Sequence, residues 1–532
     1  MKKLSIYKNF FLNLILPAFA YGSVTGIITA IVITLYKFLA KHIINFSSIC
    51  YLYIREHLYI LPVAIILAFG VSVLFAIIYK KIPNIRGGGI PTSIGILRGK
   101  IIFKWIRTLF GVLFLSLSSF LIGIPLGNEG PSVQMGTAIG RGCVYASSKK
   151  NRAWDRYSMT GGACSGFSVA TGAPVSGIMF AIEEAHQRIS PMIIIVASVS
   201  VMFSHITAEL LSPIFGVSMN LFPKLSLQSL KIGNIWLPLL IGIVIGVFAV
   251  LFLYYYRAIY SLFNKKLKKI PHTYKIFLTI ALTIIFGVIS LNYISTGHHL
   301  IDELLVENKI AIYSLIIILL IRSTLTLFAS SNSITGGLFL PLMALGAVLS
   351  SVLAKILIYL GLDSRYYTII LVLGITACIS SMMKTPITAI IFAVEALSCY
   401  DNIIYVVIVS AVAYIITEVF RVESINETVI ERRIHEINGI RKPKAVDTYV
   451  TIQHKSFAIG KQIRDIFWPS NLLVLAVKSN TKSEGEVDQY GGKSLREGDT
   501  LHIRYMTYDE NQTLNELYAI VGEQINEEIQ EC

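Results

Sequence analysis

The segments Pro174–Glu183 (PVSGIMFAIE) and Pro386–Glu395 (PITAIIFAVE) follow one pattern and lie 212 residues apart. Their Pro, Phe, Ala and Glu positions are identical. A second pair recurs in the same order, because Pro131 in GNEGPSVQMG and Pro341 in GGLFLPLMALG lie 210 residues apart. Interrupted hydrophobic segments that recur in matching places predict a duplicated membrane protein whose two halves enclose a binding site near the middle of the bilayer.

The composition around these segments excludes an ordinary soluble enzyme. Of the 532 residues, 54% are hydrophobic and 14% are charged, whereas a soluble domain contains about 25% charged residues. Several apolar segments are too short to cross about 30 Å of hydrocarbon, so we expect an all-α, polytopic membrane fold with broken and re-entrant helices. The predicted apolar segments are residues 9–40, 58–80, 101–126, 132–147, 158–183, 190–214, 234–263, 276–292, 310–329, 336–360, 366–399 and 402–420.

Charge is distributed unevenly along the chain. Residues 1–420 contain 32 Lys and Arg against 13 Asp and Glu, while residues 421–532 contain 14 against 18. Basic clusters such as Lys149–Arg156 and Lys265–Lys275 lie between apolar segments, so the positive-inside rule explains them better than nucleic-acid binding does. The cysteines show no metal-binding or disulfide pattern. The N-terminal MKKLSIYKN lacks a cleavage site and predicts a cytosolic tail before a retained helix in a cell membrane.

From about residue 443 the composition becomes that of a soluble domain. The segments TYVTIQ (448–453), LLVLAV (472–477) and GDTLHIRYM (498–506) predict strands, while GKQIRDI (460–466) and TLNELYAIV (513–521) predict helices. Residues 443–532 therefore predict a small α+β cytosolic domain. Because it contains no phosphate-binding loop or nucleophile elbow, regulation or dimer contact is its expected role.

Three glycine–proline elements, residues 87–91, 127–131 and 336–341, each precede an apolar helix. Glycine lets the backbone approach a ligand closely, and proline suits the first helical turn. A helix N-terminus presents unpaired N–H groups and about half a positive charge, so several such ends together would bind an anion. Backbone dipoles also suit transport, because a cationic side chain in a low dielectric would hold the anion too tightly.

Two glutamates are candidates for proton-linked roles. Glu129 lies within the second element, where its carboxylate would mimic an anion until protonation neutralises it and lets it swing away. Glu183 and Glu184 end the first repeat copy near Arg188, with which one of them is expected to form an ion pair. Glu183 has a counterpart in the second copy and is assigned a structural role, whereas Glu184 has none and is the candidate proton acceptor.

Four motifs carry a resemblance to a known family: GGGIP, GNEGPSVQMGTAIGR, GAPVSGIMFAIEEA and GGLFLP. In order and approximate spacing they resemble the CLC family of chloride channels and chloride/proton exchangers, and the resemblance covers roughly residues 10–440. It implies a membrane domain at 1–442 with inverted halves at roughly 10–215 and 234–440. It also implies cytosolic termini and a homodimer with a separate anion pathway in each subunit.

The resemblance assigns roles to individual residues. Glu129 matches the gating glutamate and Glu184 the internal proton glutamate of the exchangers, which favours chloride/proton antiport. Three positions depart from the family pattern: Asn128 replaces an Arg, Gly88 stands where the family places Ser or Pro, and Asn426 falls on an anion-contacting Tyr. The central site thus keeps backbone donors but loses two side-chain donors. The candidate anion-binding residues are Gly87, Gly88, Gly89, Ile90, Gly130, Leu338, Phe339 and Asn426.

A further resemblance concerns the C-terminal part. The segment GGKSLREGDTLHIRY (491–505) resembles the C-terminal regulatory subdomain of RCK/TrkA potassium-transport proteins, and not the paired CBS domains of larger CLC relatives. Some such subdomains bind cyclic dinucleotides at a dimer interface. Cyclic di-AMP is therefore a candidate regulator, and no other cofactor is predicted.

Other functions stay open at this point. A passive voltage- or ligand-gated anion channel of the same fold would not need Glu184. A cation-coupled solute transporter would need acidic and carbonyl ligands for its cation, and only Glu129 and the Glu183/Glu184 pair offer the acidic ones. An enzyme is not predicted, because no nucleophile and base occur at a recognisable spacing.

Overall fold

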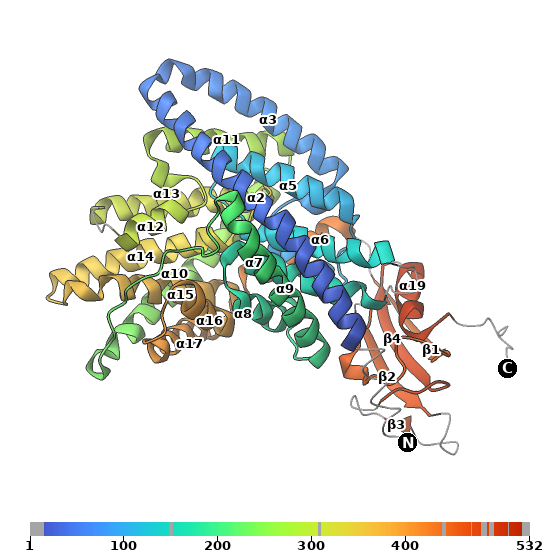
Figure 1. Ribbon diagram of the computed structural model, residues 1–532. Helices are drawn as coiled ribbons and strands as arrows, with labels where there is room; N and C mark the ends of the chain where they lie inside the picture. Colours follow the sequence, from blue (N-terminus) through green and yellow to red (C-terminus); the bar gives the residue numbers. More distant parts are fainter. Residues whose placement is uncertain are drawn as a thin grey trace.

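The computed structural model describes residues 15–147, 153–306, 310–438, 443–469, 471–479, 487–488, 494–508 and 510–523. A large helical domain contains the described residues up to Asn438, and a small sheet domain contains those from Lys444 onward (Figure 1). This arrangement confirms the predicted fold class. The predicted N-terminal tail lies outside the described residues.

The first half of the helical domain extends to Phe215. Its helices are α2 (Leu16–Glu56), α3 (Leu61–Lys81), α4 (Gly89–Leu97), α5 (Trp105–Ile122), α6 (Glu129–Ser147), α7 (Asp155–Thr171), α8 (Pro174–Met179), the π-helix η5 (Phe180–Ala185) and α9 (Pro191–Phe215). Two 3₁₀ turns, η2 (Leu58–Ile60) and η3 (Pro83–Ile85), connect them.

The second half begins at Ile232. Its helices are α10 (Trp236–Ser261), α11 (His272–Ile289), α12 (His298–Val306), α13 (Ile312–Ser331), α14 (Phe339–Tyr359), α15 (Tyr367–Met383), α16 (Pro386–Ala396), α17 (Ile403–Val419) and α18 (Ile425–Asn438). The short connecting turns are η6 (Ile232–Asn234), η7 (Leu262–Lys266), η8 (Leu291–Tyr293) and η9 (Ser364–Tyr366).

The helices repeat with the spacing found in the sequence. The first residues of α7 and α15, of α8 and α16, and of α9 and α17 are each 212 residues apart, and those of α6 and α14 are 210 apart. Among the described residues, nine helical segments are long and apolar enough to cross a membrane. The duplicated, multi-pass architecture is thus confirmed.

Two predicted apolar segments, 158–183 and 366–399, are each divided between two helices. Gly172 (φ 72°) and Lys384 (φ 59°) adopt the left-handed conformation that ends α7 and α15. A proline then begins α8 and α16. A left-handed residue followed shortly by proline stops one helix and starts the next, so the segments form the short, broken helices that only a protein interior can accommodate.

The two repeat copies bind each other through their terminal glutamates. Glu183, at the end of the first copy, accepts hydrogen bonds from two N–H groups at the start of α16 (2.9 and 2.7 Å) and from the Thr388 hydroxyl (2.6 Å). Glu395, at the end of the second copy, accepts the equivalent bonds at the start of α8 (2.8 and 2.9 Å) and from the Ser176 hydroxyl (2.8 Å). The C-terminal end of each repeat copy thus contacts the N-terminus of the other copy, so α8 and α16 run antiparallel.

Glycines let the interior helices cross closely. A Cβ atom at Gly136 on α6 would lie 2.0 Å from the carbonyl oxygen of Gly162 on α7, and one at Gly162 would lie 2.0 Å from that of Gly136. No side chain fits at that distance, so the two backbones are in direct contact, as small residues permit in membrane helix pairs. α6, with Glu129 as its first residue, is held firmly against the core.

The C-terminal domain is a four-stranded antiparallel sheet with the order β1-β4-β2-β3, where β1 is Lys444–Thr451, β2 Leu472–Lys478, β3 Val487–Asp488 and β4 Thr500–Thr507. Its closing helix α19 (Glu510–Val521) contributes Leu517 to the buried cluster that contains Leu501. The helix predicted at 460–466 is wrong. Only the 3₁₀ turn η10 (Ile463–Asp465) forms, because Gln462 and Ile466 on either side have extended backbones.

The paired glutamates yield a stability prediction. Replacing Glu183 or Glu395 with Ala leaves helix N–H groups without an acceptor, which should lower the free energy of unfolding by about 2 kcal/mol in either variant. The measurement is the melting temperature of the purified full-length protein in detergent. As a control, Glu423→Ala removes only an exposed ion pair with Arg257 and should melt like the wild type. Equal melting temperatures for all variants and the wild type would contradict a stabilising role for the hydrogen bonds between α8 and α16.

Candidate functional site

The three glycine–proline elements meet at the N-termini of α4, α6 and α14. Gly127 and Gly337 form an antiparallel bridge in which each N–H group donates to the other's carbonyl oxygen at 2.7 Å. The N–H group of Gly87 donates to the Ser333 carbonyl oxygen at 2.8 Å, and that of Gly336 donates to the Gly87 carbonyl oxygen at 3.4 Å. Backbone hydrogen bonds thus join elements from both halves, and the N-termini of the three helices lie close together.

Two of these glycines are required by the close approach of the backbones. A Cβ atom at Gly89 would lie 1.9 Å from the Gly130 carbonyl oxygen, and one at Gly130 would lie 2.6 Å from the Cα atom of Gly337. Gly88 differs, because its Cβ would have no neighbour closer than 3.3 Å, the Cδ atom of Pro91. A small side chain at Gly88 would need only a slight shift. The missing hydroxyl there is therefore a property of this sequence and is not imposed by the fold.

Glu129 lies at the centre of the convergence as the first residue of α6. Its side chain is 0% exposed, and within the described chain neither carboxylate oxygen has a side-chain hydrogen-bond partner. The Oε2 atom lies close over the backbone of Gly127, 2.3 Å from where a Cβ atom of that glycine would stand. A buried carboxylate without partners is costly, and such groups mark functional sites more often than structural ones.

Backbone amides and two basic side chains surround this carboxylate. The N–H groups of Leu340 and of Glu129 itself lie within hydrogen-bonding reach of it, and the side chains of Lys37 and His298 act on it through their charge. Lys37 donates to the carbonyl oxygens of Val169 (3.0 Å) and Ser218 (3.1 Å), so it is held beside the site and does not bind Glu129. The site offers positive potential without a fixed ion pair.

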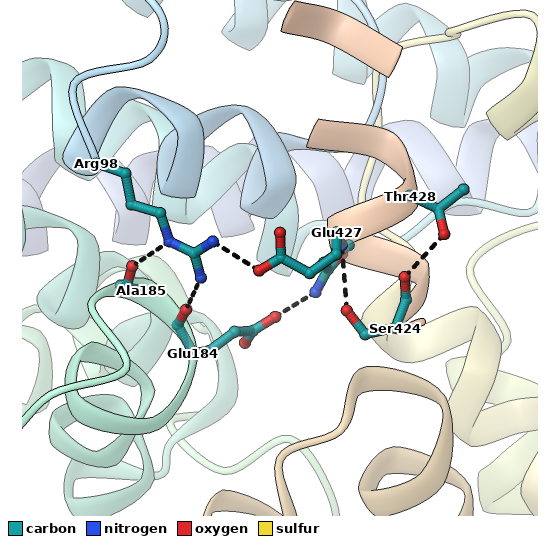
Figure 2. A network of polar contacts seen from close by, with 7 residues as sticks. Arg98, Glu184, Ala185, Ser424, Glu427 and Thr428 are labelled. Carbon is teal, nitrogen blue, oxygen red and sulfur yellow. Dashed lines mark hydrogen bonds and ion pairs between the residues drawn. The ribbon is translucent and has the colours of Figure 1, made fainter. Parts of the chain in front are cut away.

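Glu184 occupies a second buried position, in the π-helix η5. Its side chain is 7% exposed, and it accepts a short hydrogen bond from the side-chain amide of Asn426 on α18. Figure 2 shows Arg98 beside it, at the end of α4. The Arg98 guanidinium donates to the carbonyl oxygens of Glu184 and Ala185, both at 2.8 Å, and pairs with Glu427 at 2.6 Å. Two elements, α4 and α18, thus hold Glu184 in place.

Asn426 and Phe339 have contacts that the sequence did not predict. The amide of Asn426, a predicted anion-binding group, donates to Glu184, although the two residues lie far apart in the chain. Phe339 begins α14, and its ring makes edge contacts with Phe167 and Phe392, each 5.2 Å between ring centroids. Because those rings come from opposite halves, they fix the N-terminus of α14, where Leu338, Phe339 and Leu340 carry the N–H groups.

The predicted ion pair with Arg188 does not form among the described residues. Glu183 instead binds the start of α16, where two N–H groups and a hydroxyl satisfy its charge. Arg188 lies over the ring of Phe467 at 4.6 Å. The sequence analysis also missed Arg98 and Glu427, and the available signal was a pair of basic residues, Arg98 and Lys100, shortly after the GGGIP motif.

The described part of the chain contains no cluster of three or more His, Cys, Asp or Glu side chains able to hold a metal ion. The structure instead places one buried carboxylate, that of Glu129, among backbone N–H donors, and a second, that of Glu184, beside the amide of Asn426. Backbone N–H donors can bind small anions, and carboxylates can exchange protons.

The inverted halves and broken helices define a polytopic membrane protein of the inverted-repeat class. A profile of the family described as "Voltage gated chloride channel" matches residues 69–418. The chain therefore belongs to the voltage-gated chloride channel family, the CLC family, as its motifs predicted.

Individual relatives agree with this placement. The H(+)/Cl(-) exchange transporter ClcA of Vibrio vulnificus (strain YJ016) is 28% identical over 368 residues, covering 68% of this chain and 77% of the relative. ClcA of Klebsiella pneumoniae (strain 342) is 24% identical over 401 residues, covering 74% and 84%. The crystal structure of a slow cyanobacterial Cl-/H+ antiporter has a TM-score of 0.70 at 22% identity, covering 79% of this chain and 99% of the other. A CLC-type fluoride/proton antiporter has a TM-score of 0.62 at 20% identity, covering 76% and 96%.

The backbone contact at the site can be tested with a matched pair of glycines. Gly89→Ala would push a methyl group into the Gly130 carbonyl, so we expect loss of the monodisperse peak in size-exclusion chromatography in detergent. Gly70→Ala lies in α3 with no atom within 4 Å of the added Cβ. It should leave the peak intact and raise stability by up to about 1 kcal/mol. Normal behaviour of Gly89→Ala would contradict the direct contact.

Proposed function

We propose that this protein exchanges chloride, or another small monovalent anion, for protons across a cell membrane, and that it acts as a transporter and not as an enzyme. The observation that carries the proposal is the buried carboxylate of Glu129, without a side-chain hydrogen-bond partner in the described chain, where the N-termini of α4, α6 and α14 meet. The relatives named as H(+)/Cl(-) exchange transporters support it.

In the proposed mechanism Glu129 competes with the anion. The carboxylate, when ionised, occupies the positive potential of the helix N-termini. Protonation removes its charge, so the side chain loses its attraction to the site and leaves it to the anion. The anion then lies among backbone N–H groups of the glycine–proline elements, including those of Gly88, Gly89, Leu338 and Phe339. One proton thus accompanies each replacement of the Glu129 carboxylate by an anion.

Glu184 provides the second proton site on the path to the cytosol. Its partner Asn426 suits both protonation states, because an amide can donate to a carboxylate and can also accept from a protonated carboxyl group. A cation in the same place would favour the ionised form only. The pairing therefore supports reversible protonation, and it favours exchange over passive conduction.

The proposal is tested by anion and proton flux in liposomes. Under a chloride gradient with potassium and valinomycin setting the voltage, the wild type should drive protons uphill. Glu184→Gln should abolish proton movement and retain anion flux, because the amide cannot carry a proton. Glu129→Gln should also abolish proton movement, and its anion flux should lose its dependence on pH. Glu423→Gln, on the exposed ion pair with Arg257, serves as the control.

Other outcomes assign other functions. Anion flux in the wild type without proton movement would mean a passive channel of the same fold. Absence of anion flux together with sodium-dependent uptake of a solute would mean a cation-coupled transporter. Either result would overturn the exchange mechanism.

We further propose a homodimer in the lipid bilayer, with a separate pathway in each subunit and both termini in the cytosol. The basic joints between the helices support this orientation through the positive-inside rule. Residues 1–442 would form the transport domain, and residues 443–532 a regulatory domain of the RCK/TrkA-C type. The antiparallel sheet with its closing helix is compatible with such a subdomain.

Cyclic di-AMP is the ligand proposed for the cytosolic domain. Residues 491–493 of the motif that suggested it lie outside the described residues. We expect the full-length protein to bind cyclic di-AMP in isothermal titration, and saturating nucleotide to change the anion flux. Cyclic di-GMP serves as the control nucleotide. If cyclic di-AMP, like the control, neither binds nor alters the anion flux, cyclic di-AMP is not the regulator of this domain.

A further inference from the structure

One segment of the cytosolic domain, residues 463–468, lies directly on the membrane domain. The hydroxyl of Tyr157 on α7 donates to the carbonyl oxygen of Asp465 at 2.6 Å and accepts from the N–H group of Phe467 at 3.2 Å. Arg156 donates to the Trp468 carbonyl oxygen, and it also pairs with Glu516 on α19 at 2.8 Å. Polar contacts on two elements of the cytosolic domain thus fix it to the start of α7.

Phe467 is the apolar anchor of this contact. Its side chain is 6% exposed and belongs to the core of the membrane domain, whereas the neighbouring Ile466 belongs to the core of the cytosolic domain and Trp468 packs against that core. The Phe467 ring lies 4.4 Å from the ring of Tyr157 and 4.5 Å from that of His186, measured between centroids. Its position therefore connects the cytosolic domain to the residue two places after Glu184.

The chain from Glu184 to Arg188 is held from two sides. Arg98 on α4 binds the carbonyl oxygens of Glu184 and Ala185 on one side. On the other side, Phe467 packs on the His186 ring and beneath the Arg188 guanidinium at 4.6 Å. Thr160 on α7 adds a hydrogen bond to the His186 ring at 2.9 Å.

The backbone of this segment has an unusual conformation. Residues 180–185 form a π-helix, and Gln187 has φ 52°. Both are sparsely populated conformations that persist when the surroundings enforce them, and π-helical turns concentrate at functional sites. Removing one of the two supports should therefore let the segment relax and move the Glu184 carboxyl group away from Asn426.

We infer that Phe467 is a positioning residue for Glu184, through which docking of the cytosolic domain sets the number of protons moved per anion. The inference rests on the proposed exchange function. When the cytosolic domain is docked, Phe467 supports the segment from Glu184 to Arg188, and Glu184 stays aligned for proton transfer. When Phe467 withdraws, the proton path fails while the anion path at Glu129, built from other elements, continues to conduct.

The test measures proton and anion fluxes of the full-length protein in the same liposomes. Phe467→Ala should lower the ratio of proton to anion flux about fivefold or more, with anion flux retained within about twofold. The matched control is Leu473→Ala on β2, where the side chain is 63% exposed, and its ratio should equal that of the wild type. A purely structural role would lower both fluxes together and leave their ratio unchanged.

A second variant covers the case in which Phe467→Ala does not fold. Tyr157→Phe keeps the ring but removes the hydroxyl that binds Asp465 and Phe467, and it should lower the ratio in the same direction by about twofold. If the wild type moves protons with anions and the folded variants keep the wild-type ratio of proton to anion flux, this inference alone is overturned. A wild type that moves anions without protons would overturn the proposed exchange function and the inference with it.

Discussion

The contact between three glycine-containing backbones is the constraint on which the rest of the structure depends. Gly127 and Gly337 exchange hydrogen bonds at 2.7 Å, and Gly89 and Gly130 approach too closely for any Cβ atom. Backbones that meet this closely bring helix N-termini from both halves to one place. The interior must then contain helices that begin there, which explains why α4, α6 and α14 each start at a glycine–proline element.

The arrangement also explains why the two carboxylates at the site have different surroundings. Glu129 lies among backbone dipoles and within the described residues has no side-chain hydrogen-bond partner, so its position depends on its charge. Glu184 is bound by Asn426, and its main chain is bound by Arg98, so its position depends on neighbouring elements. A gate requires a side chain that can leave, whereas a proton relay requires one that stays aligned.

The sequence predicted the parts of this structure that local patterns determine. Hydrophobic segments, glycine–proline elements and the 212-residue spacing located the helix starts and the duplication. The partner of Asn426 and the ion pair of Arg98 with Glu427 could not be predicted, because these residues meet only after distant helices have packed. The failed helix at 460–466 has the same cause, since contacts of Phe467 with the membrane domain require an extended chain around η10. Helix propensity is a weak preference that tertiary packing overrides.

The reciprocal bonds of Glu183 and Glu395, together with the Gly127–Gly337 bridge, have a consequence for how such a molecule can move. Many membrane proteins with inverted repeats expose a site alternately to each side by rocking one half against the other. Here the halves are joined by hydrogen bonds at the centre and at both ends of α8 and α16, and rocking would break all of them at once. The two halves are therefore expected to behave as one rigid frame, within which only individual side chains and short segments change position.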